Sequence, residues 1–451
     1  MSERVLPDEA AAWLRSPPVR DVEMIFPDMT GVPRGKTLPA AAFLAGQRLA
    51  IARAVAIQSY TGDFPDYRFY GEHDPDVTLE PDLSTLRPVP WAKTPRALVL
   101  CDCVDHDGGY SPIAPRSALR RVLEGYARLG LQPVVAPELE FYLFRPSANP
   151  DAPFQPPELR GGRVETGQEA FALGALNELE DFFDDLYRAC EVLGIGTDTY
   201  VHEMGVSQFE INLKHGEALA LADQTFLFKY VLKETALRHG LTAVCMAKPL
   251  AGAPGSSMHL HQSVVDANGQ NVFSDADGTP TALFHHYIGG LQTHLGALMP
   301  LFCPNPNSYR RFTKGLAAPV NLSWGVDNRS VGLRIPVAPP AARRVENRLP
   351  GCDANPYLAL AASLGAGLLG IQDQTAPSEP VQGNVFREES PCDMLPCSME
   401  AALEAMQGSH APTRLFGEAF TAALLALREL ELGCFREEIT PWERRYLRNT
   451  A

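Results

Sequence analysis

Several apolar segments of the chain alternate with a period of two, and charged residues fill the alternate positions. The clearest is "VVAPELEFYLF", residues 134–144. Successive side chains of a β-strand point to opposite faces, so Leu139, Phe141 and Leu143 share one face while Glu138 and Glu140 share the other. The two carboxylates then lie roughly 6.5–7 Å apart and repel by roughly 2.5 kcal/mol at a dielectric of about 20. A solvated strand face explains this pattern, and so does a bound cation.

The same alternation recurs in "SQFEINL", "GSSMHLHQSV" and "ARRVENRLP", while "HEMG" and "NRSVGLRIP" supply further charged residues. One strand of this kind is typical of a solvated sheet edge, whereas four or five predict that the polar faces line a common cavity. The polar positions concerned are Glu203, Gln208, Glu210, Asn212, His259, His261, Ser263, Arg329, Arg334, Arg344, Glu346 and Arg348.

Residues 1–110 predict a small α+β domain. Strand candidates such as "VEMIFPD" and "RALVLCDCVD" are interrupted by a helical pattern in "PAAAFLAGQRLAI", residues 39–51. An amphipathic helix beginning near Ala114 opens a larger domain, residues 111–451. In this domain strands alternate with helices such as "NELEDFFDDLYRACEVLGI" and "TFLFKYVLKETALRHG", and the C-terminus is helical. The Pro- and Gly-rich residues 145–167 predict a surface loop with substrate-specific structure.

Composition narrows the function classes. The 451 residues carry 39 basic and 54 acidic side chains, a net charge of −15, which argues against nucleic acid or an anionic membrane as the main partner. No apolar run reaches the length of a membrane span. The N-terminal "MSERVLPDEAAAWL" lacks the pattern of a signal peptide, and nine cysteines show no framework spacing. We therefore expect a protein of the reducing cytoplasm.

The residue types on the polar faces indicate the chemistry. Five carboxylates with one imidazole suit Mg²⁺ or Mn²⁺ better than structural zinc. Arginines grip phosphate and carboxylate groups in a bidentate manner. Divalent cations together with arginines predict phosphoryl transfer from a nucleotide, and the absence of a GxxxxGK[ST] motif excludes a P-loop enzyme. Each of these residues taken singly has a structural or solvated explanation, and the prediction depends on the whole set.

The chain resembles the glutamine synthetase family over nearly its full length. The motifs, in the family's order, are "DMTGVPRGK" (28–36), "PELEFYLF" (137–144), "HEMGVSQFEINL" (202–213), "KP" (248–249), "GSSMHLHQS" (255–263), "NPNSYRRF" (305–312), "DNRSVGLRIP" (327–336) and "RRVENRLPGCDANPYLALAA" (343–362). The resemblance implies an N-terminal β-grasp domain and a C-terminal catalytic domain, built on a curved antiparallel sheet, or half-barrel, flanked by helices. It also implies rings of six subunits, often stacked in pairs, with active sites between neighbouring subunits.

The resemblance implies a role for each polar residue. Glu140, Glu203 and Glu210 match the ligands of a first metal; Glu138, His259 and Glu346 match those of a second, which bridges the nucleotide phosphates. Arg311 and Arg348 match the arginines that hold glutamate, with Gly255 beside them. Arg329, Arg334 and Arg344 match residues around the transferring phosphate, and His261 and Ser263 match ATP contacts. In the implied reaction ATP phosphorylates the γ-carboxylate of glutamate, and a nitrogen nucleophile displaces phosphate.

Two departures from the family pattern concern the substrates. The family's flap motif Gly-x-Glu-Ala-Pro is "GLAAP" here, so that Ala317 replaces the glutamate that takes a proton from ammonium. Asp28 still matches the other ammonium-site carboxylate, which comes from the next subunit. One carboxylate and extra space suit an organic amine, as in the γ-glutamylpolyamine and γ-glutamylamine synthetase branch.

The second departure lies in the loop that reads Asn-Gly-Ser-Gly-Met-His in many family members and "PGSSMH" here. Pro254 replaces the asparagine that contacts glutamate, and Ser257 replaces the second glycine. Proline removes a hydrogen-bond donor and stiffens the backbone, and serine narrows the site. Both changes raise the question of whether glutamate is the acid substrate. The two arginines indicate an acidic substrate in either case.

The hypothesis from the sequence is ATP-dependent γ-glutamylation of an organic amine. The alternatives are a glutamine synthetase that uses ammonium, with another residue replacing the flap glutamate, and a non-catalytic structural or regulatory relative. A phosphotransferase of the guanidino-kinase type shares part of the fold, but the order of the motifs favours the synthetase.

Overall fold

The computed structural model describes residues 8–15, 18–312, 318–386 and 395–450. Its first sheet has strand order β2-β1-β6-β4-β3, with β5 paired to β6. Strands β1 and β6 run parallel at its centre, and the remaining pairs are antiparallel. The strands are β1 (Asp21–Pro27), β2 (Pro33–Pro39), β3 (Leu49–Ala52), β4 (Asp76–Pro81), β5 (Arg87–Pro88) and β6 (Arg96–Val104).

The second sheet has strand order β13-β14-β15-β12-β7-β9-β8, with β10 and β11 also paired to β7. The expectation of a wholly antiparallel sheet is wrong at one edge, where β13 and β14 are parallel, because the connection 327–332 returns the chain to the start of the pair. The strands are β7 (Leu131–Phe144), β8 (Thr197–His202), β9 (Gln208–Leu213), β10 (Gly216–Glu217), β11 (Thr242–Val244), β12 (Met258–Asp266), β13 (Trp324–Val326), β14 (Leu333–Ile335) and β15 (Val345–Asn347).

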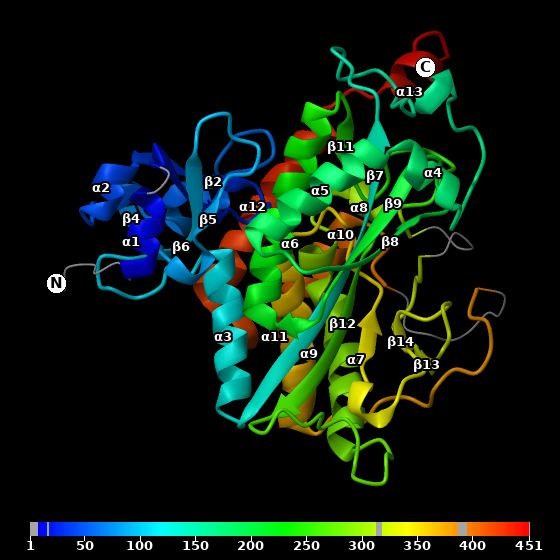
Figure 1. Ribbon diagram of the computed structural model, residues 1–451. Coiled ribbons are helices and arrows are strands. Elements are labelled where there is room, and N and C mark those ends of the chain that lie inside the picture. The colour runs from blue at the N-terminus through cyan, green and yellow to red at the C-terminus, as the bar shows by residue number, and fades with distance from the viewer. Residues whose placement is uncertain (1–7, 16–17, 313–317, 387–394, 451) are drawn as a thin grey trace.

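Helices pack against the second sheet and make up most of the C-terminal part of the chain (Figure 1). The helices are α1 (Asp8–Arg15) and α2 (Ala40–Leu44), which lie beside the first sheet, and α3 (Pro115–Ala127), α4 (Leu173–Glu178), α5 (Glu180–Leu193), α6 (Ala218–Arg238), α7 (Ala282–Phe302), α8 (Pro306–Tyr309), α9 (Pro356–Asp373), α10 (Met399–Gln407), α11 (Ala411–Phe416), α12 (Glu418–Glu437) and α13 (Pro441–Tyr446). Among these described elements, no helix is both long enough and apolar enough to cross a membrane.

Two helical patterns were predicted too long. The pattern over residues 39–51 forms only the short α2, because Gly46 adopts a left-handed φ of 76°, after which the chain continues into β3. The pattern that begins at Asn177 is split between α4 and α5 at Leu179, whose φ and ψ are not helical. Residues 145–167, predicted as a loop, contain only a single short 3₁₀ turn, Arg160–Gly162, and an isolated bridge between Glu158 and Val164.

The apolar face of β7 packs into the main hydrophobic core, and its polar face is left for the site. Leu139, Phe141 and Leu143 are fully buried there, as the alternation predicts. Behind them, α7 and α9 approach closely at Gly290 and Gly370, where a Cβ added to Gly290 would lie 2.5 Å from the Gly370 Cα atom. The two helices therefore pack tightly against each other, and α3 and α6 contact β7 itself.

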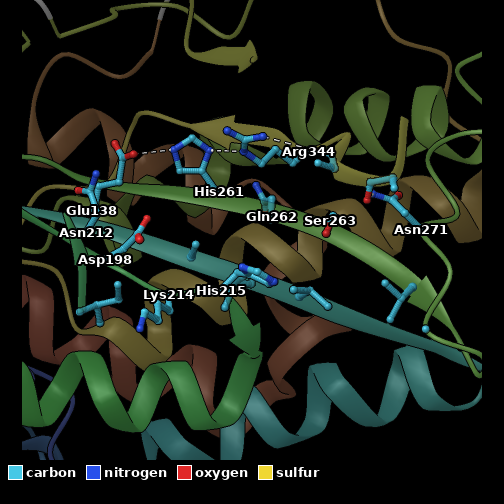
Figure 2. A pocket seen from close by; sticks show the side chains of 18 residues that line it. Glu138, Asp198, Asn212, Lys214, His215, His261, Gln262, Ser263, Asn271 and Arg344 are labelled. Atoms are coloured by element: carbon cyan, nitrogen blue, oxygen red, sulfur yellow. Dashed lines mark hydrogen bonds and ion pairs between the residues drawn. The ribbon is translucent and has the colours of Figure 1, made fainter. Parts of the chain in front are cut away.

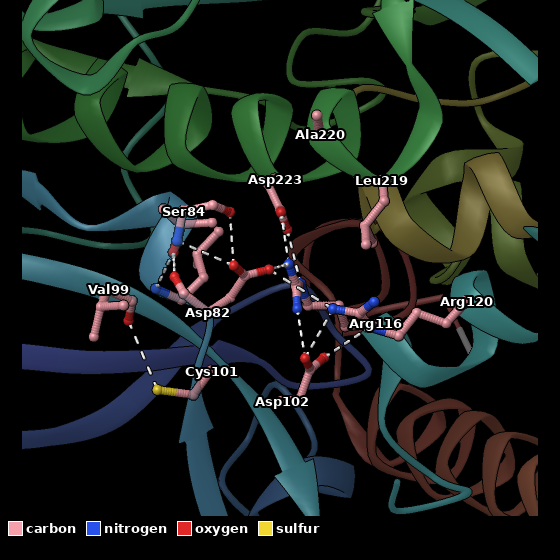
Figure 3. A network of polar contacts seen from close by, with 12 residues as sticks. Asp82, Ser84, Val99, Cys101, Asp102, Arg116, Arg120, Leu219, Ala220 and Asp223 are labelled. Atoms are coloured by element: carbon pink, nitrogen blue, oxygen red, sulfur yellow. Dashed lines mark hydrogen bonds and ion pairs between the residues drawn. The ribbon is translucent and has the colours of Figure 1, made fainter. Parts of the chain in front are cut away.

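A buried arginine joins the first sheet to the helices of the second (Figure 3). Arg116 of α3 donates to Asp82, which directly follows β4, and to Asp102 of β6, both at 2.7 Å, and to both oxygens of Asp223 in α6 at 2.9 and 3.0 Å. Arg120 also contacts Asp102 at 2.9 Å. Since a buried charge is costly unless it is paired, the three carboxylates fix α3 between the two parts of the chain.

Candidate active site

Strand register brings the predicted polar residues together on one face of the second sheet. Glu138 pairs with His259 on one side and with Asn212 on the other, while Glu140 pairs with Glu210. Directly opposed residues in antiparallel strands lie about 4.5–5.5 Å apart at Cβ and share a face. The carboxylates that the sequence places on separate strands thus converge around β7.

Two groups of side chains have ligand atoms close enough to share a cation. The ligand atoms of Glu138, His259 and Glu346 lie within 4.8 Å of one another, as predicted for the second metal. Those of Glu140, Glu210 and His259 meet the same limit. The first predicted set had Glu203 in place of His259; Glu203 instead lines a small cavity beside Glu140.

Four carboxylates in this group show pKa values displaced in opposite directions. Burial opposes ionisation of Glu138 and Glu346, but their histidine and arginine neighbours outweigh it, so that the pKa of Glu138 is lowered and that of Glu346 falls to about 2. Burial and the charge of Glu203 raise the pKa of Glu140 to about 8. Burial and the charges of Glu138 and Glu140 raise the pKa of Glu210 to about 9. The cluster thus contains more buried carboxylates than its histidines and arginines can neutralise.

This donor set fits hard divalent cations. A cation between the carboxylates would reverse the repulsion that raises the pKa values of Glu140 and Glu210. Burial and the neighbouring Arg348 lower the pKa of His259, so its ring is neutral near pH 7 and can act as a ligand. Oxygen donors with one imidazole suit Mg²⁺ or Mn²⁺.

Two buried arginines, Arg311 and Arg348, line a cavity of about 40 Å³ together with Glu140 and Glu203. Arg311 donates from Nη1 to the Ser257 hydroxyl at 2.9 Å, and Arg348 pairs with Glu346. Among the residues that the structure describes, the Nε atoms of both arginines are buried without a hydrogen-bond partner. Guanidinium groups held in this way can receive the carboxylates of an acidic substrate.

The loop that carries the second departure shapes this cavity. Gly255 cannot be replaced without movement, because a Cβ there would lie 2.4 Å from Arg311 Cγ and 2.6 Å from the Ala247 carbonyl oxygen. The Pro254 carbonyl accepts from the Tyr142 hydroxyl at 2.8 Å, and the Ser257 N–H donates to Glu140 at 2.7 Å. Ser257, expected to narrow the site, therefore connects the Glu140 carboxylate to Arg311.

The remaining arginines occupy different surroundings. Arg334 donates to Glu346 at 2.7 Å and to Asp327 at 2.6 Å, so it lies at the second ligand group. Arg344 donates to His261 Nδ1 at 3.1 Å, and His261 Nε2 lies 2.9 Å from Glu138. Arg329 is exposed and lines neither cavity described here.

A larger cavity of about 960 Å³ extends from Glu138 along β12 (Figure 2). Of the four residues predicted to contact ATP, His261, Ser263 and Arg344 line it, and Arg334 does not. Sequence reasoning missed other polar residues of this lining, because they lie in turns and at strand ends where alternation carries no signal. They are Asp198, Lys214, His215 and Asn271.

Two predicted residues of the amine site are placed differently. Asp28 is fully buried, and its carboxylate accepts from Thr30, Val32 and Arg34. It lines neither cavity of its own chain. Ala317 lies outside the described residues.

Comparison with known proteins agrees with this geometry. The profile of the glutamine synthetase catalytic domain matches residues 112–447. The chain is 35% identical to a glutamine synthetase of Pyrococcus abyssi (strain GE5 / Orsay), over 90% of this chain and 88% of that one. It is 33% identical to a glutamate–isopropylamine ligase of Pseudomonas sp (93% of each chain) and to the gamma-glutamylputrescine synthetase PuuA of Escherichia coli K12 (97% and 93%).

The fold also matches a solved relative. The structure of apo GmaS without ligand superposes with a TM-score of 0.84 at 29% identity, covering 97% of this chain and 99% of that one. Enzymes of this type use ATP and divalent metals in general. The mixed fold, the curved sheet, the converging carboxylates and the sequence matches agree, and the chain belongs to the glutamine synthetase family and is a carbon–nitrogen ligase.

Proposed function

We propose that this enzyme joins the γ-carboxylate of L-glutamate to an organic amine at the expense of ATP, giving a γ-glutamylamide, ADP and phosphate. The observation that carries this proposal is the mixed lining of the small cavity. Besides Glu140, Glu203 and the two arginines, the lining includes three residues without charge, Met204, Pro254 and Ala318. Ammonium has no apolar surface to bury there, whereas an alkylamine does.

The relatives are consistent with an organic amine as the nucleophile, but they do not distinguish it from ammonium. Two of them are named for organic amines, isopropylamine and putrescine, but the Pyrococcus glutamine synthetase is equally similar in sequence. The flap residue favours the amine, because Ala317 supplies neither the anion that attracts ammonium nor the base that deprotonates it. We propose a polyamine or monoamine as the substrate.

The residues that would hold the metals are the two groups around β7. We propose Glu140, Glu203 and Glu210 for one Mg²⁺ or Mn²⁺, and Glu138, His259 and Glu346 for another. Such cations, when bound, neutralise charge on the transferring phosphoryl group. His261, Ser263 and Arg344 would contact ATP in the larger cavity, which reaches the second group at Glu138.

The two steps follow from these positions. Arg311 and Arg348, with Gly255 close beside them, would hold glutamate so that its γ-carboxylate oxygen attacks the γ-phosphorus of ATP and ADP leaves. Arg329 and Arg334 would stabilise the charge on the transferring group. The amine nitrogen then attacks the acyl carbon, loses a proton, and phosphate departs.

Assembly and domain structure belong to the same proposal. We propose that residues 1–110 form a β-grasp domain and residues 111–451 the catalytic domain. The enzyme would work as a cytoplasmic homo-oligomer of six or twelve subunits, in which Asp28 of a neighbouring subunit completes the amine site. This role requires the Asp28 carboxylate, which is fully buried in its own chain, to become accessible at the contact between subunits.

The test is to identify the product. The enzyme, ATP, Mg²⁺ and L-glutamate are incubated with single amines, from alkylamines to diamines and polyamines, or with ammonium, and the amide is detected by mass spectrometry. A γ-glutamylamide of an organic amine supports the proposal. Glutamine as the main product would favour the second candidate, a glutamine synthetase, and the absence of any product together with no ATP-dependent thermal shift would favour a non-catalytic relative.

A further inference from the structure

A buried carboxylate outside the predicted site lies beneath the turn that carries Glu203. Glu165 comes from the irregular segment 145–167 and is only 3% exposed. Its carboxylate lies 3.1 Å from Nε2 of His202, which is fully buried. It also accepts the backbone N–H of Ser207 at 3.0 Å. One side chain of the loop thus contacts both ends of the turn formed by residues 203–207, between β8 and β9.

The turn is held in a conformation that it would not adopt freely. Ser207 has a φ of 58°, in the left-handed region that non-glycine residues rarely occupy. Phe171, which donates its backbone N–H to the His202 carbonyl at 2.8 Å, has a φ of 61°. Residues in such regions persist where the surroundings over-determine them. The Glu165 carboxylate is the group that the Ser207 N–H requires in this buried place.

The contact continues from His202 to the predicted metal ligand. His202 Nδ1 lies 2.7 Å from the carbonyl oxygen of Glu203, so the ring bridges Glu165 to the Glu203 backbone. The Glu203 side chain in turn accepts the Met204 N–H at 3.1 Å. Both Glu203 and Met204 line the small cavity. The Glu203 N–H donates to the Gln208 carbonyl of β9 at 2.8 Å, so Glu165 and His202 add a second set of contacts to the turn that already joins the two strands.

We propose that Glu165 is a positioning residue for the active site: it fixes the 203–207 turn and, through His202, the place of the Glu203 carboxylate. This inference rests on the proposed role of Glu203 as a metal ligand. It makes the 145–167 loop part of the catalytic apparatus, because Glu165 connects this loop to the turn that carries Glu203. Partners that orient metal ligands contribute about 10–100-fold to metal affinity or activity.

The test measures Mn²⁺ binding to the whole protein by titration calorimetry, without nucleotide or amine. We expect E165Q to weaken the tightest Mn²⁺ site about 10-fold, and E165D to give an intermediate loss. Excess Mn²⁺ should restore the kcat of E165Q, which a simple loss of fold would not allow. The control is E158Q, an exposed glutamate of the same loop that makes no contact with the turn, and it should bind Mn²⁺ as the unaltered enzyme does.

Several results would overturn the inference. Mn²⁺ binding by E165Q within about twofold of the unaltered protein would do so, as would the absence of Mn²⁺ binding in the unaltered protein. If E165Q does not fold, a folded E165D with unchanged affinity has the same meaning. Failure of the unaltered enzyme to use any amine would speak against the proposed function alone, since the binding measurement contains no amine.

Discussion

Arg311 donates a hydrogen bond from Nη1 to the hydroxyl of Ser257, at 2.9 Å. Ser257 replaces a glycine of the family pattern, and its backbone N–H also donates to Glu140 at 2.7 Å. The departure therefore does more than reduce space: it fixes the guanidinium proposed to bind the acid next to a proposed metal ligand.

Removal of the Ser257 hydroxyl should weaken glutamate binding. In S257A, Arg311 loses a fixed acceptor, and a hydrogen bond to a charged group contributes about 1.5–3 kcal/mol, where 1.4 kcal/mol is tenfold. We expect the KM for glutamate to rise about 10-fold, with a smaller change in kcat, in steady-state assays at saturating ATP. The matched control is S256A, since the neighbouring Ser256 hydroxyl is buried and has no hydrogen-bond partner in the described part of the chain. Equal KM values for the two variants would refute this role.

Introduction of the flap glutamate should move specificity toward ammonium. A317E adds both an anion for ammonium and a base for its proton, and it occupies space that an amine side chain needs. The ratio of kcat/KM for ammonium to that for the best organic amine should rise at least about 10-fold, measured by competition between the two nucleophiles. A317Q adds the same volume without the charge and should lower amine use without improving ammonium use. An unchanged ratio in A317E would show that this position does not select the nucleophile.

The stability of the metal-free protein should depend on pH in a defined direction. The pKa of Glu140 is raised to about 8 and that of Glu210 to about 9, from an ordinary value of 4.5. Between about pH 5 and pH 8 the folded state holds protons that the unfolded state has released, so stability falls as pH rises. The opposite contribution of Glu346, whose pKa is about 2, is lost only below about pH 4.5 and does not affect this window.

A divalent cation should therefore stabilise the protein more at high pH. Metal binding requires ionised carboxylates, so below about pH 8 part of the binding energy is used to release protons. Thermal shifts on addition of Mn²⁺ should be larger at about pH 8.5 than at about pH 6. Equal shifts at the two pH values would show that Glu140 and Glu210 are not ligands.

The Arg116 network should be one of the largest single contributions to stability outside the core. R116M leaves Asp82, Asp102 and Asp223 without their shared partner, and breaking a buried ion pair from one side costs about 3–5 kcal/mol. R121M, on the exposed side of the same helix, should cost no more than about 0.5 kcal/mol. The midpoint of urea denaturation of the two variants provides the comparison. Similar midpoints would mean that the network contributes little.

Alternation alone predicted the sheet that builds the site. β7, β9 and β12 lie where the period of two places them, and Glu138, Glu140 and His259 share one face, because burial of the opposite face leaves no other register. Which strands are neighbours was not predicted, since periodicity does not specify the order of strands.

The sequence did not reveal the residues that support the site. Glu165 lies in a segment without periodicity, and its partners His202 and Ser207 are about 40 residues away along the chain. Asp198 and Asn271 reach the large cavity from strand ends and turns. Such contacts depend on how loops fold back over the sheet, which local pattern does not encode. The helix expected over residues 39–51 was wrong because one glycine ended it early.

The most direct test of the central proposal is the rate of phosphate release from ATP with Mg²⁺ and L-glutamate, comparing ammonium with a panel of alkylamines, diamines and polyamines. The account predicts a kcat/KM for the best organic amine at least about 10-fold above that for ammonium. A rate with ammonium that exceeds that of every amine in the panel would contradict it, and would mean that another group performs the task of the glutamate that Ala317 replaces.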